Sequence, residues 1–138
     1  MSKKLKEMLV RHEAMQLKPY KCTAGKTTIG VGRNLDDLGI TEGEALHMLE
    51  NDIRRVRLEL ESYPWYSKLN VVRQDALMNM CFNLGISRFR TFKNMITALG
   101  VGAWARAADE TMDSKWARQV GKRSTELAMM IRYGEYME

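Results

Sequence analysis

The chain has 138 residues, of which 45% are hydrophobic and 28% are charged. This size and balance fit one globular domain and exclude a disordered chain or a fibrous repeat. Lys and Arg number 22 against 17 Asp and Glu, and the resulting net charge of +5 favours association with polyanions such as nucleic acid, anionic lipid or an acidic cell wall.

The N-terminal residues predict a helix of about three turns. Its mostly apolar face is formed by residues three and four positions apart, namely Leu5, Met8, Leu9 and His12. We expect this face to be buried, His12 to be a core histidine, and Glu13 to lie at the end of the helix. Charged residues interrupt the segment from its start, which leaves no apolar run for a signal peptide. We therefore expect a protein that is made and stays soluble in a cytoplasm, without stable membrane insertion.

Residues 17–35 predict a β-hairpin. Two short stretches rich in β-forming residues flank a glycine-containing turn at residues 23–26, which is the usual pattern of such a motif. Pro19, in the first stretch, is compatible with the start or the edge of a strand. Cys22 and Thr28 flank the turn almost symmetrically, so the hairpin is expected to place them close together.

A long helix is predicted from about residue 42 to just before Pro64. It begins with a capping box, in which the Thr41 hydroxyl accepts a hydrogen bond from a helical N–H while the Glu44 carboxylate reaches back. A continuous apolar stripe follows, made of Leu46, Leu49, Ile53, Val56 and Leu60. A helix of this length is able to join two lobes.

Beyond Pro64 the sequence predicts helices only. The expected segments are residues 72–84 ended by Gly85, residues 92–99 ended by Gly100, and segments around residues 104–108 and 127–131. Cys81 stands on an apolar stripe of the first of these helices, where we expect it in the core. The fold class is therefore α+β, with a small β-hairpin lobe, a larger all-helical lobe and a cleft between them.

Glu13, Cys22 and Thr28 are the candidate chemical groups, because a hairpin that folds back on the first helix brings them to one rim. Glycosidic cleavage needs an acid that protonates the departing oxygen and a second group across the sugar that directs water or attacks directly. A carboxylic acid kept protonated by desolvation supplies the first group, and a thiolate supplies the second. On spacing alone, structural roles for the three residues are the simpler interpretation.

Stretches around these residues resemble the phage-type lysozymes, glycoside hydrolase family 24. The similar stretches extend over nearly the whole chain, at residues 7–13, 17–20, 25–32, 76–85 and, more loosely, 116–123. In that family a Glu is followed after eight residues by Asp or Cys, and after five more by Thr. In this sequence the pattern selects Glu13, Cys22 and Thr28.

The resemblance implies a lysozyme-like fold in a single domain of residues 1–138. Its N-terminal lobe would comprise about residues 13–60, and its helical lobe about residues 1–12 together with residues 61–138. It also implies hydrolysis of the β-1,4 bonds between N-acetylmuramic acid and N-acetylglucosamine in peptidoglycan strands, for lysis of a phage host. The enzyme would act as a monomer without a cofactor, and would leave the host cytoplasm through a holin-formed lesion to reach the periplasm and cell wall.

Residue matching to the family assigns roles within this site. Glu13 is expected as the general acid, Cys22 as the replacement for the more usual Asp, and Thr28 as the residue that places water or steadies an intermediate. The expected substrate-binding residues are Phe82, Asn83, Gln119 and Arg123, the last as a basic neighbour of the catalytic Glu.

The sequence departs from the family pattern in three places. Arg33 stands where the family commonly has His, so an ion pair built on that histidine is absent or rebuilt. Asn83 stands where the family often has Gln. The connection between hairpin and long helix is shorter than in many relatives, which would open the cleft. The anomeric outcome, and the choice between an endolysin and a tail-borne lysozyme, are open at this point.

The residues by themselves are also compatible with two other functions. A thiol-dependent wall peptidase would pair Cys22 with His12 or His47 as its base. A non-enzymatic binding module would use the basic residues between positions 88 and 123. We expect no nucleic-acid partner, because aromatic residues are not interleaved with these charges and no DNA-reading motif is present. We also expect no metal, because the two cysteines are not spaced as metal ligands.

Overall fold

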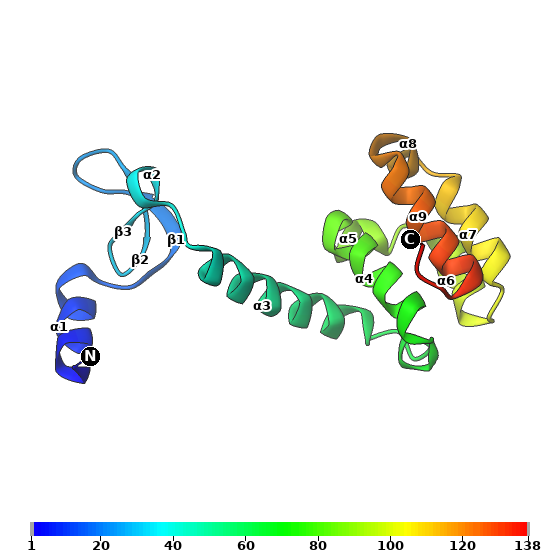
Figure 1. Cartoon of the computed structure of the whole chain (residues 1–138), viewed down its shortest axis with the longest axis horizontal. Helices are drawn as coiled ribbons and strands as arrows, with labels where there is room; N and C mark the ends of the chain where they lie inside the picture. Colours follow the sequence, from blue (N-terminus) through cyan, green and yellow to red (C-terminus); the bar gives the residue numbers. More distant parts are fainter. Residues whose placement is uncertain (1, 138) are drawn as a thin grey trace. The chain divides into compact units, whose positions relative to one another are not determined.

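The computed structural model describes residues 2–137. Within that range it contains nine α-helices, one 3-10 helix and three short strands (Figure 1). This mostly helical chain with a small antiparallel sheet confirms the predicted α+β class. The chain forms two compact units, and the boundary between them falls between Met48 and Leu49, inside one helix.

The first unit begins with helix α1 (Lys3–Glu13), whose N-terminus is capped by Ser2. The helix matches the prediction, and Glu13 is its last residue. None of its side chains is buried, and His12 is exposed. Because this exposure is that of the first unit by itself, the burial of this face and of His12 stays a prediction. The structure groups α1 with residues up to Met48, so the assignment of residues 1–12 to the helical lobe stays a prediction.

The antiparallel sheet of the first unit has its strands in sequence order: β1 (Gln16–Lys21), β2 (Thr27–Gly30) and β3 (Arg33–Asn34). The β1–β2 pair is the predicted hairpin, with Tyr20 opposite Thr28 and Lys21 opposite Thr27. The third strand has only two residues and escapes a pattern that needs several alternations to be recognised. Helix α2 (Leu35–Leu38) follows directly and is capped by the Asn34 side chain.

Helix α3 (Glu42–Leu60) is the predicted long helix. Its capping box forms as expected: the Glu44 N–H donates to the Thr41 hydroxyl oxygen at 3.1 Å, and the Thr41 N–H donates to the Glu44 carboxylate at 2.9 Å. The backbone N–H groups of Thr41 and Glu44 thus both find partners within the same turn. The start of this helix is therefore predictable from the local sequence. No helix within residues 2–137 combines the length and the apolar character that crossing a membrane requires.

The second unit is helical throughout. Its elements are η1 (Tyr66–Lys68), α4 (Val71–Leu84), α5 (Ile86–Phe89), α6 (Lys93–Gly100), α7 (Trp104–Met112), α8 (Lys115–Val120) and α9 (Lys122–Tyr133). Helix α9 packs against α4, α7 and α8, and α6 packs against α7. Their shared core includes Cys81, as predicted, which is 1% exposed. Helix α4 ends at Gly85, whose φ of +80° favours glycine.

Phe89 is the largest fully buried side chain of this core and is 0% exposed. We expect Phe89→Ala to lower the free energy of unfolding by about 3–5 kcal/mol, because it removes the buried ring and leaves a cavity. The matched control is Val101→Ala, at a side chain that is 77% exposed, for which a change within about 0.5 kcal/mol is expected. Urea unfolding of both variants tests this. Equal losses in the two would contradict the described core.

Candidate active site

Cys22 and Thr28 lie side by side at the β1–β2 turn. The Cys22 N–H donates a hydrogen bond to the Lys26 carbonyl oxygen at 2.9 Å. The Thr28 hydroxyl donates to the same oxygen, also at 2.9 Å, and the Thr28 side chain is buried. In the antiparallel register Tyr20 faces Thr28, so Cys22, two residues further along, projects to the same face of the hairpin as Thr28.

The turn also surrounds the Cys22 sulfur with hydrogen-bond donors. The backbone N–H groups of Lys26 and Ala24, and then the Thr28 hydroxyl, lower the pKa of the Cys22 thiol below its ordinary value, while partial burial opposes them. Donors aimed at the sulfur stabilise the thiolate, the form that acts as nucleophile or base. Cys22 is half-buried and forms no disulfide. The hairpin therefore presents a reactive sulfur beside a hydroxyl.

Glu13 meets the sheet at the β2–β3 turn. A Cβ atom built at Gly32 would lie 2.7 Å from the Glu13 carboxylate oxygen Oε2, so a side chain there would displace the carboxylate from its present position. Gly32 also has a φ of +67°, a backbone conformation that side chains disfavour. Gly32 therefore allows the exposed carboxylate to approach the sheet four residues after Thr28. Sequence reasoning singled out Glu13 but missed Gly32, whose only signal was its place in the Gly-Val-Gly run.

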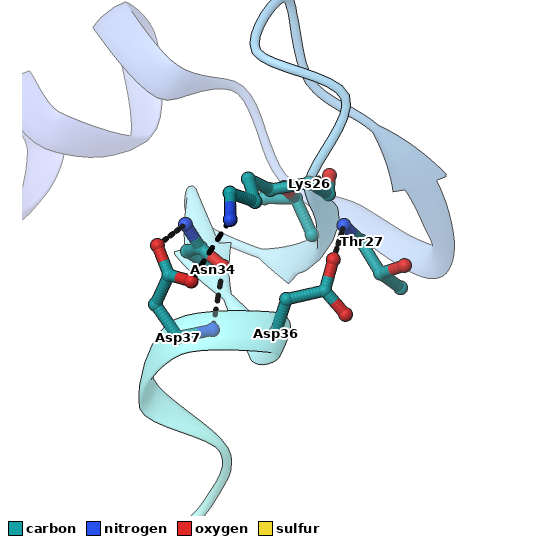
Figure 2. A network of polar contacts seen from close by, with 6 residues as sticks. Lys26, Thr27, Asn34, Asp36 and Asp37 are labelled. Carbon is teal, nitrogen blue, oxygen red and sulfur yellow. Dashed lines mark hydrogen bonds and ion pairs between the residues drawn. The ribbon is translucent and has the colours of Figure 1, made fainter.

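A network of hydrogen bonds and an ion pair connects the β1–β2 turn to helix α2 (Figure 2). The Thr27 N–H donates to the Asp36 carboxylate at 2.8 Å, and the Lys26 ammonium pairs with the Asp37 carboxylate at 3.2 Å. Asn34 completes the network, since its side chain both donates to the Asp37 carboxylate and accepts from the Asp37 N–H. Sequence reasoning missed these contacts. The available signal was a helix start with Asn34 as N-cap and two acidic residues, Asp36 and Asp37, in the first turn.

Arg33 forms a bidentate ion pair with Glu44. Its two terminal nitrogens lie 3.0 and 2.9 Å from the two carboxylate oxygens, and one of them also donates to the Gly39 carbonyl at 3.1 Å. This pair lines a largely apolar pocket of about 720 Å³ together with His47. Arg33 thus forms an ion pair with the first turn of α3, and whether this pair replaces the one built on the family histidine stays a prediction.

The Arg33–Glu44 pair predicts a pH-dependent contribution to stability. Arg33, then the backbone N–H of Thr41, lower the pKa of Glu44 from 4.5 to about 2. Because the pKa is depressed in the folded protein, the contribution is present above about pH 4.5 and is lost as the pH falls toward 2. We expect wild type to melt at a higher temperature than Glu44→Gln at pH 6 and the difference to shrink by pH 2.5. A difference that stays constant over this range would contradict the assignment.

The four predicted substrate-binding residues lie in the second unit. Phe82, 42% exposed, and Arg123 line one pocket of about 440 Å³, which Met78 also lines. Arg123 is held there by Asn79, which accepts from its Nε at 2.8 Å. Asn83 and Gln119 are exposed and are not among the residues that line this pocket.

Asn83 is instead fixed by Trp116, a residue that sequence reasoning did not assign to the site. The Trp116 indole N–H donates to the Asn83 side-chain oxygen at 2.8 Å. This contact orients the amide so that its NH₂ group is left to donate elsewhere. Trp116 itself is buried and packs edge-on against Phe92.

Comparison with known proteins gives a consistent picture. The family model described as phage lysozyme matches residues 10–132. An endolysin of Acyrthosiphon pisum secondary endosymbiont phage 1 is 32% identical over 85% of this chain and 81% of its own length. Probable T4-type lysozyme 1 of Dictyostelium discoideum is 29% identical over 94% of both chains. The pre-baseplate central spike protein Gp5 of Enterobacteria phage T4 is 30% identical over 93% of this chain, which spans only 27% of that relative.

Proposed function

Because the chain belongs to the phage lysozyme family, and with it to the peptidoglycan-degrading glycoside hydrolases, we propose that Glu13, Cys22 and Thr28 carry out its reaction. The bond cleaved is the β-1,4 linkage between N-acetylmuramic acid and N-acetylglucosamine. The observation that carries the proposal is the shared Lys26 carbonyl, which holds Cys22 and Thr28 on one face of the hairpin. The alternatives of a thiol peptidase and a basic binding module are not favoured by this membership.

Glu13 is the proposed general acid. Its carboxyl group donates a proton to the glycosidic oxygen as the bond to the anomeric carbon breaks, so the departing sugar leaves as a neutral alcohol. Support comes from the position of the side chain, which is exposed at the end of α1 and approaches the sheet closely at Gly32. The desolvation expected of the acid is thus not provided by the described residues of the first unit.

Cys22 and Thr28 are the proposed water-positioning pair. The Thr28 hydroxyl donates to the Lys26 carbonyl, and its oxygen also has lone pairs that accept a hydrogen bond from a water molecule. One hydrogen of this water molecule is held by the Thr28 oxygen, and the Cys22 thiolate takes the other as a proton. The water oxygen forms the new bond to the anomeric carbon at the same time. The proton is then exchanged with solvent, and Glu13 is reprotonated.

This route predicts the configuration of the product. Attack by water opposite the departing oxygen gives the α-anomer at the new reducing end, whereas direct attack by the Cys22 sulfur followed by hydrolysis gives the β-anomer. Proton NMR of a soluble glycan during the first minutes of digestion, before mutarotation, distinguishes the two. The α-anomer is expected. The β-anomer would contradict the water route and make Cys22 the nucleophile.

Substrate contacts and cellular setting complete the proposal. Phe82 and Arg123 are proposed to contact the glycan through the pocket that they share, and Asn83 through its free amide NH₂ group. Gln119 is proposed as a further contact from its exposed position on α8. We propose a monomer that reaches the wall from the host cytoplasm through a holin-formed lesion. Its net charge of +5 favours association with the anionic wall.

A further inference from the structure

One peptide group, between Lys26 and Thr27, connects Cys22, Thr28 and helix α2. Its carbonyl oxygen accepts hydrogen bonds from the Cys22 N–H and from the Thr28 hydroxyl. Its N–H, on the Thr27 side, donates to the Asp36 carboxylate at 2.8 Å. The two ends of a peptide group lie in one rigid plane. The direction of the N–H therefore fixes the direction of the carbonyl that Cys22 and Thr28 share.

We propose that Asp36 is a positioning residue, which holds the Lys26–Thr27 peptide group in the orientation that keeps Cys22 and Thr28 together. A hydrogen bond to an ionised carboxylate is shorter and stronger than one between neutral groups. It also polarises the peptide group, so the carbonyl becomes a better acceptor for Cys22 and Thr28. The catalytic importance of Asp36 rests on the proposed function, whereas its effect on the Cys22 thiol does not.

The contacts around helix α2 and the turn hold Asp36 in a defined position. Helix α2 is capped by Asn34, which also binds the Asp37 side chain, and Figure 2 shows Asp36 and Asp37 pointing from α2 toward Lys26 and Thr27. Two ammonium groups, those of Lys26 and Lys21, also contact this network. The first pairs with Asp37, and the second donates to the Thr27 hydroxyl at 2.6 Å. Both the backbone and the side chains of the turn are thus anchored.

Reorientation of this segment has a measurable chemical consequence. The N–H of Lys26 is the first of the groups that lower the pKa of the Cys22 thiol. Loss of the Asp36 contact frees the segment and weakens that hydrogen bond, which raises the thiol pKa. Removal of the Asp36 negative charge alone acts in the opposite direction, because a nearby anion disfavours the thiolate. The two effects are therefore separable by the choice of substitution.

The test compares Asp36→Ala with Asp36→Asn in the full chain. Asn removes the charge but keeps an oxygen that accepts from the Thr27 N–H. Glu42→Ala, on an exposed side chain of α3, is the control for charge removal in the same unit. Iodoacetamide labelling of Cys22 is followed from pH 6 to pH 10, with peptide mass spectrometry to separate Cys22 from buried Cys81. Steady-state kinetics on a soluble glycan give kcat and KM.

Asp36→Ala is expected to move the pH midpoint of Cys22 labelling upward by about one pH unit and to lower kcat about tenfold with KM changed less than about twofold. Asp36→Asn and Glu42→Ala are expected to keep the wild-type midpoint or to fall slightly below it. If Asp36→Ala does not fold, Asp36→Ser serves instead, because its hydroxyl is too short to reach the Thr27 N–H.

Coincident midpoints for Asp36→Ala, Asp36→Asn and Glu42→Ala would overturn the positioning role. A raised midpoint in Asp36→Ala, combined with full activity of Cys22→Ala, would support the positioning of the thiol and refute the catalytic role of Cys22. A raised midpoint with the tenfold loss of kcat supports both. The failure of the positioning role and the failure of the proposed function are therefore distinguishable.

Discussion

Glu13→Gln is expected to lower the rate of peptidoglycan hydrolysis by about a thousandfold while leaving the fold unchanged. The amide has nearly the same shape as the carboxyl group but has no acidic proton for the departing glycosidic oxygen. Because Glu13 is exposed at the end of α1, its replacement removes little packing. The rate is measured as clearing of chloroform-treated Gram-negative cells, and the fold is followed by circular dichroism during thermal unfolding.

Glu7→Gln is the matched control for this experiment, because Glu7 is an exposed carboxylate on the same helix. Its clearing rate is expected to stay within about twofold of wild type. Glu13→Gln clearing cells as fast as the parent would show that the acid lies elsewhere.

Cys22→Ala is expected to lower kcat/KM by about a hundredfold, since it removes the group that accepts the proton of the attacking water. Cys22→Asp is expected to stay active, because a carboxylate at this position also accepts the proton of the attacking water. The two active forms should differ in pH dependence. Activity of wild type rises as the pH passes the thiol pKa, whereas Cys22→Asp should reach its plateau at far lower pH, because a carboxyl group ionises near pH 4, about four pH units below a thiol.

Alkylation provides an independent check on Cys22. Iodoacetamide is expected to inactivate wild type and Cys81→Ala alike, since Cys81 is buried and its thiol pKa is raised to about 11, first by desolvation. Cys22→Asp is expected to resist inactivation. Cys22→Ala with full activity, or a Cys22→Asp profile identical to that of wild type, would remove the thiolate from the mechanism.

Sequence patterns predicted the parts of the fold that depend on local rules. Helix α3 was predicted with its start because Thr41 and Glu44 satisfy the first backbone donors themselves, and the β1–β2 hairpin followed from two stretches around a glycine turn. Five short elements, namely β3, α2, η1, α5 and α8, with two to six residues each, were not predicted. They are too short to show a periodicity, and packing rather than propensity stabilises them.

The part of the candidate site that lies on the hairpin was predictable from the sequence. Cys22 and Thr28 flank one turn, so their proximity follows from the register. Asp36 and Gly32 were missed because their roles depend on contacts across the unit, with the Thr27 N–H and with the Glu13 carboxylate. His12 is exposed within the first unit, and periodicity alone does not tell which residues cover the face of a helix.

Analysis of the products of sacculus digestion tests most directly the claim that this chain is a muramidase acting through Glu13. Purified sacculi are incubated with wild type and with Glu13→Gln, and the released fragments are identified by mass spectrometry after borohydride reduction. Wild type is expected to release fragments that end in reduced N-acetylmuramic acid, with no new peptide amines, and Glu13→Gln to release almost none. New free amines without new reducing ends, or equal release by the two proteins, would contradict the account.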